Sequence, residues 1–421
     1  MKYTEMSRAE LLAEKAVLEK QYEDYKARGL RLDLSRGKPN SEQLDVGEGF
    51  YKLSMEKPLY INNGMDCRNY GVLEGLPEMR AFFAELFSVP KENVLIGGNS
   101  SLQLMFDTLM RALVFGFCDS PRPWMLEEKK KWICVVPGYD RHFRITEQLG
   151  FELISVDMKE DGPDMDAVEA LVKDPAVKGI WCVPKYSNPT GNTYSDETVK
   201  RLASMKCAAP DFTIMWDNAY AVHDLDENGD KLLDIFAEAE KCGNKDRVFY
   251  YSSTSKITFP GGGVSFMAAS EENLAYLKPF MGAQTIGYDK INQLRHLKFF
   301  KNAENVKAHM MRHAEFIKKK FDITLDALSN LEGLDIAEWT KPRGGYFVSL
   351  DIKVGSAKRV FELMKSAGVT LTAVGATYPY KRDPEDKNLR LAPTYPTNDE
   401  LRLALEILVV AIKMAAIEKL L

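Results

Sequence analysis

The sequence predicts an α/β protein in which a large domain with a mainly parallel sheet is followed by a smaller α/β domain. The chain has 421 residues, well above a typical domain of roughly 150. Its hydrophobic content of 45% is sufficient for an extensive core. Between about residues 70 and 300, short apolar runs alternate with helical stretches, which is typical of parallel strands joined by crossover helices.

The N-terminal segment predicts a helix followed by an extended arm. Ser7 and Glu10 form a capping box, so a helix is expected to run from there to about Lys26 and to stop near Gly29. The following residues, 31–40, contain breakers and read as an arm that crosses toward another domain. We therefore predict an N-terminal helix and arm over residues 1–50 that join the small domain, a large domain over 51–305 and a small C-terminal domain over 306–421.

The strands of the large domain are predicted from short apolar runs that end in Gly, Pro, Ser or Asn. They lie at 94–96, 132–136, 179–183, 213–216, 248–251 and 264–268. After residue 300, the pattern predicts a long basic helix to Phe321, a strand-rich segment at 344–350 and a last helix capped by Thr397.

Composition and charge exclude several classes of protein. The 56 basic and 61 acidic residues leave a net charge of −5 without long blocks of one sign, so neither a nucleic-acid partner nor an anionic membrane is expected. No apolar run approaches the ~20 residues of a membrane span, and the N-terminus is not signal-like. The scattered cysteines and histidines predict no disulfide framework and no metal site. We expect a soluble, cytoplasmic protein that binds small molecules or a second copy of itself.

Four polar segments stand at predicted strand ends, where ligands gather in parallel sheets. They are GGNSS at 97–101, KYSNPTG at 185–191, DNAY at 217–220 and SSTSK at 252–256. The first could hold a phosphate at a helix N-terminus or be an ordinary glycine turn with a serine cap. Because the chain lacks both the Walker and the GxGxxG patterns, a nucleotide site is disfavoured.

Lys256 and Asp217 each leave two interpretations open. Ser253 and Lys256 match the SxxK pattern of serine acyl-transfer enzymes, but the SDN and KTG partner motifs are missing. A lysine at a strand end can also act as a Schiff-base nucleophile, or simply be a solvated charge. Asp217 ends an apolar run, so it is either a buried carboxylate that needs a cationic partner or a turn residue.

The joint order of these segments identifies a family. Along the chain stand Tyr70 with Gly75 and Met79-Arg80, GGNS at 97–100, PGY at 137–139, NPTG at 188–191, DNAY at 217–220, STSK at 253–256 and Arg390 in NLRL at 388–391. In this order and over nearly the whole chain, they resemble the class I aminotransferase family, the fold type I enzymes of pyridoxal 5′-phosphate. The resemblance implies a large cofactor-binding domain with a mainly parallel seven-stranded sheet flanked by helices, and a smaller α/β domain.

The resemblance also implies a role for each matched residue. Lys256 would form the Schiff base with the cofactor and then carry the proton, while Asp217 would keep the pyridine nitrogen protonated. The other matched residues would hold the cofactor ring (Tyr139, Asn188, Tyr220), the phosphate (Asn99, Ser100, Ser253, Ser255) or the substrate (Gly37, Arg36, Asn188, Arg390). Tyr70 would reach the phosphate of the other subunit, which implies a homodimer with shared active sites.

One position departs from the family pattern. Many members have a phosphate-binding arginine eight residues after the lysine, but this chain has Val264 there, after the glycine run 261–263. The glycine run either lets backbone amides approach the phosphate or makes a tight turn. Together with SRGKP at 35–39, PGYDRH at 137–142 and TYPY at 377–380, this departure resembles a divergent bacterial branch of the aspartate aminotransferases.

The resulting hypothesis is an aspartate:2-oxoglutarate aminotransferase with a ping-pong mechanism. A dicarboxylate substrate needs a second cation, for which Arg36, Lys38, Arg141, Lys185 and Lys290 are candidates. The alternatives are an aminotransferase for another amino acid, a β-eliminating lyase and a non-catalytic cofactor-sensing regulatory module. The last is disfavoured, because the roughly 30 residues before the arm are too few for a DNA-binding domain.

Overall fold

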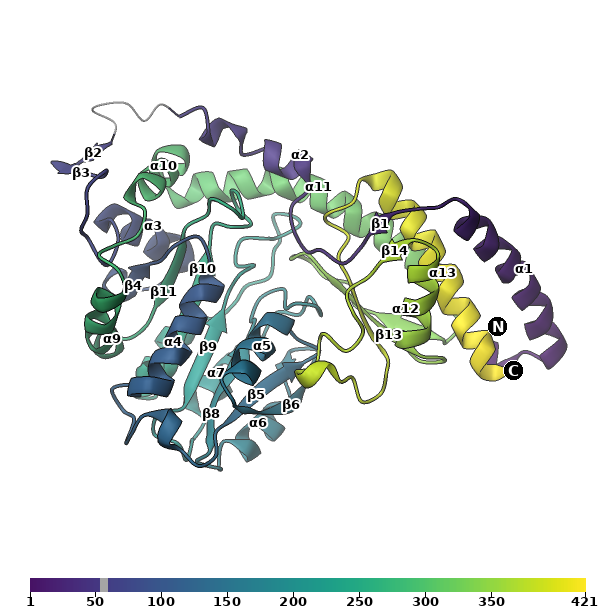
Figure 1. Cartoon of the computed structure of the whole chain (residues 1–421), viewed down its shortest axis with the longest axis horizontal. Coiled ribbons are helices and arrows are strands. Elements are labelled where there is room, and N and C mark those ends of the chain that lie inside the picture. Colours follow the sequence, from purple (N-terminus) through teal and green to yellow (C-terminus); the bar gives the residue numbers. More distant parts are fainter. Residues whose placement is uncertain (54–59) are drawn as a thin grey trace.

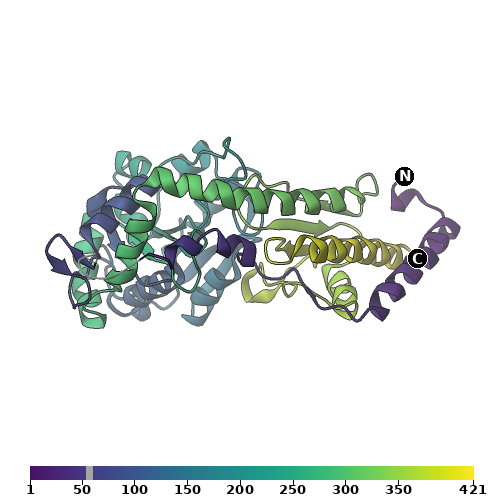
Figure 2. The same ribbon diagram turned by 90° about the horizontal axis from the view of Figure 1, so that it is seen from above.

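The computed structural model describes residues 1–53 and 60–421 and has a large part and a smaller part (Figure 1). The large part surrounds an eight-stranded sheet, and the smaller part contains both chain termini. The view from above shows one long helix, α11 (Ala303–Ser329), running from the large part along the smaller one (Figure 2). Among the described residues, none of the helices has the length and apolar character needed to cross a lipid bilayer.

The large sheet confirms the predicted α/β class and contains all six predicted strands. Its order is β4 (Val94–Ile96), β11 (Ser265–Ala268), β10 (Val248–Ser253), β9 (Thr213–Asp217), β8 (Val177–Cys182), β5 (Lys131–Val136), β6 (Glu152–Lys159) and β7 (Gly162–Pro163). All strands run in one direction except β11 and β7, which pair antiparallel with their neighbours. The sheet has one strand more than the seven expected, because the chain folds back after β6 and adds the two-residue β7.

Helices cover both faces of this sheet, which is why its strands are apolar throughout. One face packs against α4 (Ser101–Phe115), α5 (Asp140–Gln148) and α9 (Glu271–Gln284). The other packs against α3 (Pro77–Phe87), α6 (Met165–Leu171), α7 (Asp196–Ser204), α8 (Ile235–Lys241), α10 (Lys290–Phe300) and the first half of α11. The short hairpin β2 (Ile61–Asn62) and β3 (Met65–Asp66) precedes α3. Among the described residues of the large sheet, the strand ends are the part that these helices leave uncovered.

The smaller part is built on three antiparallel strands, β12 (Ala337–Trp339), β13 (Val348–Ile352) and β15 (Asn388–Leu391). Helices α12 (Ala357–Ser366) and α13 (Asn398–Leu420) pack against them. The predicted strand at 344–350 begins only at Val348, because the backbone of Gly344 and Gly345 lies against Tyr186. The helix expected to end at Phe321 continues to Ser329, since its buried apolar face continues through Ile323 and Leu328.

The N-terminal segment packs with the smaller part. Helix α1 (Arg8–Ala27) starts at the capping box of Ser7 and Glu10, as predicted. The arm then forms β1 (Leu32–Asp33), which pairs parallel with β14 (Val369–Thr370), and continues to α2 (Ser41–Asp45). The first half of α11 belongs to the core of the large part and the second half to the core of the smaller part. This helix belongs to both cores, so it marks no boundary between them. The domain limits at residues 50 and 305 therefore stay predictions.

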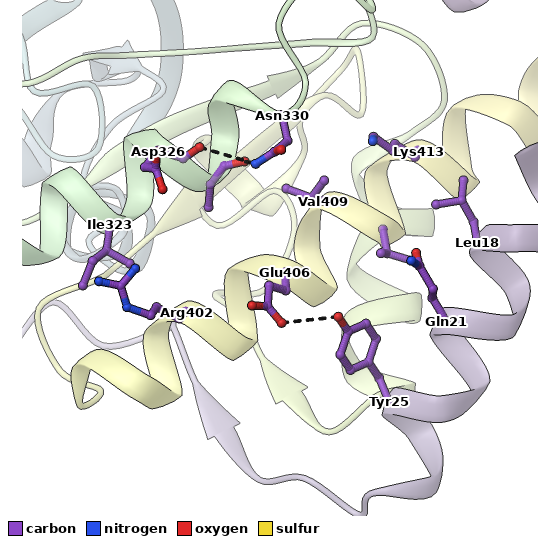
Figure 3. A pocket seen from close by; sticks show the side chains of 12 residues that line it. Leu18, Gln21, Tyr25, Ile323, Asp326, Asn330, Arg402, Glu406, Val409 and Lys413 are labelled. Atoms are coloured by element: carbon purple, nitrogen blue, oxygen red, sulfur yellow. Dashed lines mark hydrogen bonds between the residues drawn. The ribbon is translucent and has the colours of Figure 1, made fainter.

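A cavity of about 340 Å³ separates parts of α1, α11 and α13 (Figure 3). Across it, the Tyr25 hydroxyl donates to Glu406 Oε2 at 3.3 Å. Leu18 and Val409 add apolar surface from opposite sides. This cavity shares no described lining residue with the strand-end cavity of the large part. It belongs to the packing of the N-terminal helix.

A buried ion pair ties β8 to the loop that precedes β9. Lys178 Nζ lies 3.1 Å from Asp211 Oδ1, and both side chains are almost fully buried. The other oxygen of Asp211 accepts hydrogen bonds from Trp124 Nε1 at 2.6 Å and from Ser120 Oγ at 2.8 Å. A buried carboxylate with these partners depends on the lysine for its countercharge.

We expect Lys178→Met to lower the free energy of unfolding by about 3–5 kcal/mol, because it leaves the Asp211 carboxylate buried without a cation. Urea denaturation followed by tryptophan fluorescence measures this loss. Lys241→Met is the control: it removes an exposed ion pair with Glu238 and should cost less than about 1 kcal/mol. Equal losses in the two variants would contradict the role of burial.

Candidate active site

A cavity of about 230 Å³ lies where the predicted strand ends meet the smaller part. Most of the residues predicted from the sequence line it: Gly37, Ser100, Tyr139, Asn188, Asp217, Tyr220, Ser253, Ser255 and Lys256. They come from the arm, from the start of α4 and from the carboxyl ends of β5, β8, β9 and β10. The remaining lining residues, which we had not predicted, are Ser101, Leu102, Met105, Val183, Ala219 and Phe347.

Lys256 lies in the turn that follows β10, with its amine over the ring of Tyr220. The distance from Lys256 Nζ to the ring centroid is 4.9 Å. Burial lowers the pKa of Lys256 below the ordinary 10.5, and the negative charge of Asp217 opposes this shift. The amine is therefore easier to deprotonate than that of a solvated lysine, as a nucleophile or a base requires.

Asp217 ends β9 and is buried, so its two oxygens need partners. His142 Nε2 donates to Asp217 Oδ2 at 2.9 Å, and the His142 ring stacks on Trp181 at 4.3 Å with an interplanar angle of 11°. Asp217 Oδ1 is also buried but has no hydrogen-bond partner among the described residues. An unpartnered carboxylate oxygen at the wall of a cavity is suited to a cationic N–H donor from a ligand.

His142, the partner of Asp217, was not among the predicted site residues. It lies in the first turn of α5, three residues after Tyr139. From there its ring reaches Asp217 at the end of β9. Two features of the sequence could have indicated the pair: Asp217 was expected to be buried and to need a cationic partner, and His142 follows the end of another predicted strand. The pairing itself spans 75 positions in the sequence, so no local pattern shows it.

Arg390 on β15 is held beside the cavity by two residues of the large part. Its Nη1 donates to Asp140 Oδ1 at 2.9 Å and to Asn188 Oδ1 at 3.3 Å. Its guanidinium carbon lies 5.1 Å from the ring centroid of Phe347. Asp140 and Phe347 were not predicted. The cavity is therefore bordered by one ordered guanidinium, which can bind a carboxylate.

Gly37 has no room for a side chain because of Phe347. A Cβ at this position would lie 2.0 Å from the tip of the Phe347 ring. The arm can therefore pass over the cavity only with glycine here.

The opposite wall of the cavity has the character of a phosphate site. The N-terminus of α4 carries Ser100 as its cap, and within the described structure the Ser100 side chain makes no capping hydrogen bond. Ser253 and Ser255 face the same cavity from the lysine turn. Hydroxyl groups and free amides at a helix N-terminus bind anions.

The glycine run after Lys256 does not form part of this wall. Of the described residues that line the cavity, none belongs to 261–263. A Cβ on Gly263 would lie 2.9 Å from the backbone nitrogen of Ser255, so this glycine permits a close approach of two chain segments. Of our two interpretations of the run, the structure favours the tight turn.

Besides Arg390, which lies beside the cavity, three predicted site residues are not part of its lining within this chain. Asn99 contributes only its backbone carbonyl, which accepts from Ser255 Oγ at 2.8 Å. Arg36 is exposed and pairs with Asp33 at 3.1 Å. Tyr70 is 83% exposed and does not line the cavity of its own chain.

Two of the candidate second cations are bound elsewhere. Lys185 Nζ lies 2.8 Å from Asp224 Oδ1. Lys290 is buried and donates to the carbonyl of Gly71 at 3.0 Å. Lys38 lies over the ring of Tyr395, 4.1 Å from its centroid. We therefore drop Lys185 and Lys290 as ligands of a substrate carboxylate, because both are already engaged.

The family model for aspartate amino-transferases matches residues 6–421 of the chain. The chain belongs to the aspartate aminotransferase family. The aspartate aminotransferase of Corynebacterium glutamicum is 49% identical over 402 residues, which cover 95% of the chain and 93% of that protein. The crystal structure of an aspartate transaminase from the same species superposes with a TM-score of 0.97 and 46% identity over 100% of both chains.

A more distant solved structure shares the fold. The α-aminoadipate aminotransferase LysN of Thermus thermophilus, crystallised with N-(5′-phosphopyridoxyl)-L-leucine, has a TM-score of 0.74 and 23% identity over 94% of this chain and 96% of its own. The family assignment, the fold type I class and the aminotransferase class predicted from the sequence are confirmed. Fold type I aminotransferases use pyridoxal phosphate.

In the cofactor-free aminotransferase, we expect Lys256 to react with pyridoxal 5′-phosphate at lower pH than an ordinary lysine. Burial destabilises the ammonium form, so the free amine persists to lower pH. Asp217→Asn should lower the Lys256 pKa further, because the Asp217 charge stabilises the ammonium. The measurement is the pH dependence of the imine absorbance.

Lys256→Ala serves as the control, since it reports the reaction of the remaining lysines. A wild-type midpoint equal to this background would contradict the effect of burial on Lys256.

Proposed function

We propose that this aminotransferase exchanges amino groups between aspartate and 2-oxoglutarate by a ping-pong mechanism with pyridoxal 5′-phosphate. The observation that carries the proposal is the cavity in which Lys256 and the open Oδ1 of Asp217 meet, on a chain 49% identical to an aspartate aminotransferase. The amine, the unpartnered buried carboxylate oxygen and the hydroxyl-lined helix N-terminus fit the aldehyde, the pyridine nitrogen and the phosphate of that cofactor.

The residues at the ring end would hold the cofactor by complementary groups. Lys256 would hold its aldehyde carbon covalently, and Asp217 Oδ1 would accept a hydrogen bond from the ring nitrogen. Asn188 uses its Oδ1 for Arg390, so its amide N–H groups remain to donate to the phenolic oxygen, together with the Tyr220 hydroxyl. Tyr139 would stack on the ring face.

At the other end of the cavity, we assign the phosphate to Ser100, Ser253 and Ser255, with Asn99 beside them. Ser255 is fixed by its bond to the Asn99 carbonyl, which orders this wall. Tyr70 of the partner subunit would complete the phosphate site in a homodimer with shared active sites. The support for this step is that Tyr70 is 83% exposed and is not among the described residues that line the cavity of its own chain.

Bound pyridoxal phosphate supplies an electron sink for the pair left when the substrate Cα loses its proton. Lys256 Nζ would take that proton and return it, and its lowered pKa makes the free amine more available for this task than that of a solvated lysine. His142 keeps Asp217 oriented by occupying Oδ2, so that only Oδ1 faces the ligand. Apolar Met105, Val183 and Phe347 restrict water around the reacting atoms.

The substrate would be bound by its carboxylates. Arg390 would hold the α-carboxylate, and the arm at Gly37 would pass over it. For the second carboxylate we propose Arg36, Lys38 or Arg141, the candidates that are not engaged in buried bonds. A cytoplasmic location stays a prediction.

The spectrum of the purified protein tests the cofactor and the substrate together. Loaded with pyridoxal phosphate, it should absorb in the visible, lose that band when aspartate is added and recover it with 2-oxoglutarate. Lys256→Ala is the matched variant and should abolish turnover, because it removes both the covalent anchor and the base.

A protein that stays colourless would contradict the cofactor, whereas a coloured protein unmoved by aspartate would contradict only the substrate. Release of pyruvate and ammonia from a β-substituted alanine would instead favour the lyase alternative.

We expect Arg390→Lys to raise KM for both aspartate and 2-oxoglutarate by about 10- to 100-fold, since a lysine cannot reproduce the bidentate carboxylate bond. Steady-state kinetics with each substrate varied in turn measure the change. Arg343→Lys, at an exposed ion pair with Asp230, is the control and should leave both values within about a factor of two. Unchanged KM values in Arg390→Lys would contradict the assignment.

A further inference from the structure

The turn that carries Lys256 is bonded from behind by two histidines on separate helices. His296 on α10 lies with its Nε2 2.9 Å from the Thr254 hydroxyl, two residues before Lys256. His309 on α11 lies with its Nε2 2.8 Å from the carbonyl oxygen of Ile257, one residue after Lys256. The backbone is thus held on both sides of the lysine.

The neighbours of His296 fix its role as an acceptor. Its Nδ1 lies 2.8 Å from the carbonyl oxygen of Asn292, so Nδ1 carries the hydrogen. Burial lowers the pKa of His296 to about 4, which leaves the ring neutral and Nε2 free to accept from the hydroxyls of Thr254 and of Thr258, whose Oγ1 lies 3.1 Å away. The Thr254 oxygen accepts in turn from the backbone N–H of Val264 at 2.8 Å. One chain of bonds therefore connects α10, the lysine turn and the residue before β11.

The neighbours of His309 fix it as a donor. Arg312 Nη2 donates to His309 Nδ1 at 2.9 Å, so the hydrogen of the neutral ring is on Nε2 and points to the Ile257 carbonyl. Burial lowers the pKa of His309 to about 4 and that of His313 to about 3. His313 Nε2 lies 3.1 Å from His309 Nε2. Because the His313 ring is neutral, its Nε2 can accept a second hydrogen bond from the hydrogen on His309 Nε2.

Helix α10 also grips the residues after the turn. Asn292 Nδ2 donates to the carbonyl oxygens of Gly262 at 2.9 Å and Gly263 at 3.1 Å. Asn292 and His296 are four residues apart, so they project from one face of α10 onto the same loop. The glycine run, which makes no side-chain contacts of its own, is ordered by this face.

We propose that His296 and His309 are positioning residues of the aminotransferase, which fix the Lys256 turn so that the amine stays at one place in the cavity. The inference rests on the proposed function, in which one nitrogen must be both anchor and proton carrier. Neither histidine is among the described residues that line the cavity, so both act through the turn. A misplacement of about 1 Å at a reacting group can cost roughly a hundredfold in rate, which makes such a support consequential.

The test uses the cofactor-loaded enzyme and variants that each replace one member of this hydrogen-bond network. Thr254→Val keeps the shape of the side chain but removes the donor to His296 and the acceptor of the Val264 N–H. His296→Leu removes the acceptor of Thr254 and Thr258, and His309→Leu removes the donor to Ile257. His309→Gln is the conservative variant, because its amide can still donate. The two readouts are kcat with KM, and the pH midpoint of the visible band of the lysine-bound cofactor.

We expect kcat to fall about tenfold in the three disruptive variants, with KM changed less than about twofold, since the substrate ligands are untouched. The spectral midpoint should rise by roughly half a pH unit or more, because water that reaches a loosened turn stabilises the protonated nitrogen. His309→Gln should retain most of both values. The double variant Thr254→Val/His296→Leu should lower kcat by less than the product of the two single effects, since both variants lose the Thr254–His296 bond.

Met310→Ala is the matched control, next to His309 on α11 and buried in the core of the large part. It should lower thermal stability and leave the spectral midpoint unchanged. Wild-type kcat and midpoint in Thr254→Val and His296→Leu would overturn the proposal, as would an equal midpoint shift in Met310→Ala. If His309→Leu does not fold, the other variants decide. A wild-type protein that binds no cofactor would instead overturn the proposed function and the inference with it.

Discussion

The burial of one carboxylate, that of Asp217, is the constraint on which the site depends. A buried carboxylate without partners is costly, and here His142 serves one oxygen while the other faces the cavity. His142 reaches Asp217 Oδ2 from the start of α5, and its ring is held in place by stacking on Trp181. The order of β9, β8 and β5 in the sheet brings these residues to one edge, so the parallel topology is what makes the carboxylate tolerable. Tyr139 then reaches the same edge because it precedes α5.

Helices α10 and α11 hold the lysine turn from behind, and each of them also contacts another part of the molecule. Helix α10 holds the lysine turn through His296 and the segment after Tyr70 through Lys290, which donates to Gly71. Helix α11 carries His309 and passes from the core of the large part into that of the smaller one. The lysine turn is therefore bonded to elements that extend well beyond it. Its position follows from the packing of the whole molecule, although its own sequence is short and rich in glycine and serine.

The sequence predicted the strands and most of the residues at their ends, because both have local signals. Apolar runs mark the strands, and a parallel sheet brings their ends together without further information. Asp140 and His142 stood next to Tyr139, yet their roles were missed, since the Arg390 and Asp217 contacts join residues 250 and 75 positions apart. Two of the eight strands were not among those predicted, β6 and β7, and the two residues of β7 are too few to show a period. For Arg36 the family match gave a role at the site while its side chain pairs with Asp33 in this chain, so that role stays a prediction.

The ion pair of Arg390 with Asp140 explains how a charged guanidinium is stabilised beside the apolar ring of Phe347. The Arg390 side chain is only 9% exposed, so without a countercharge its burial would be unfavourable. Asp140 provides that charge from α5 and is itself 33% exposed, so water screens part of its negative charge. Because Nη1 is occupied by Asp140 and Asn188, the guanidinium is fixed in one orientation before any ligand binds. A carboxylate that arrives then pays less of the ordering cost, which is the physical meaning of a preorganised anion site.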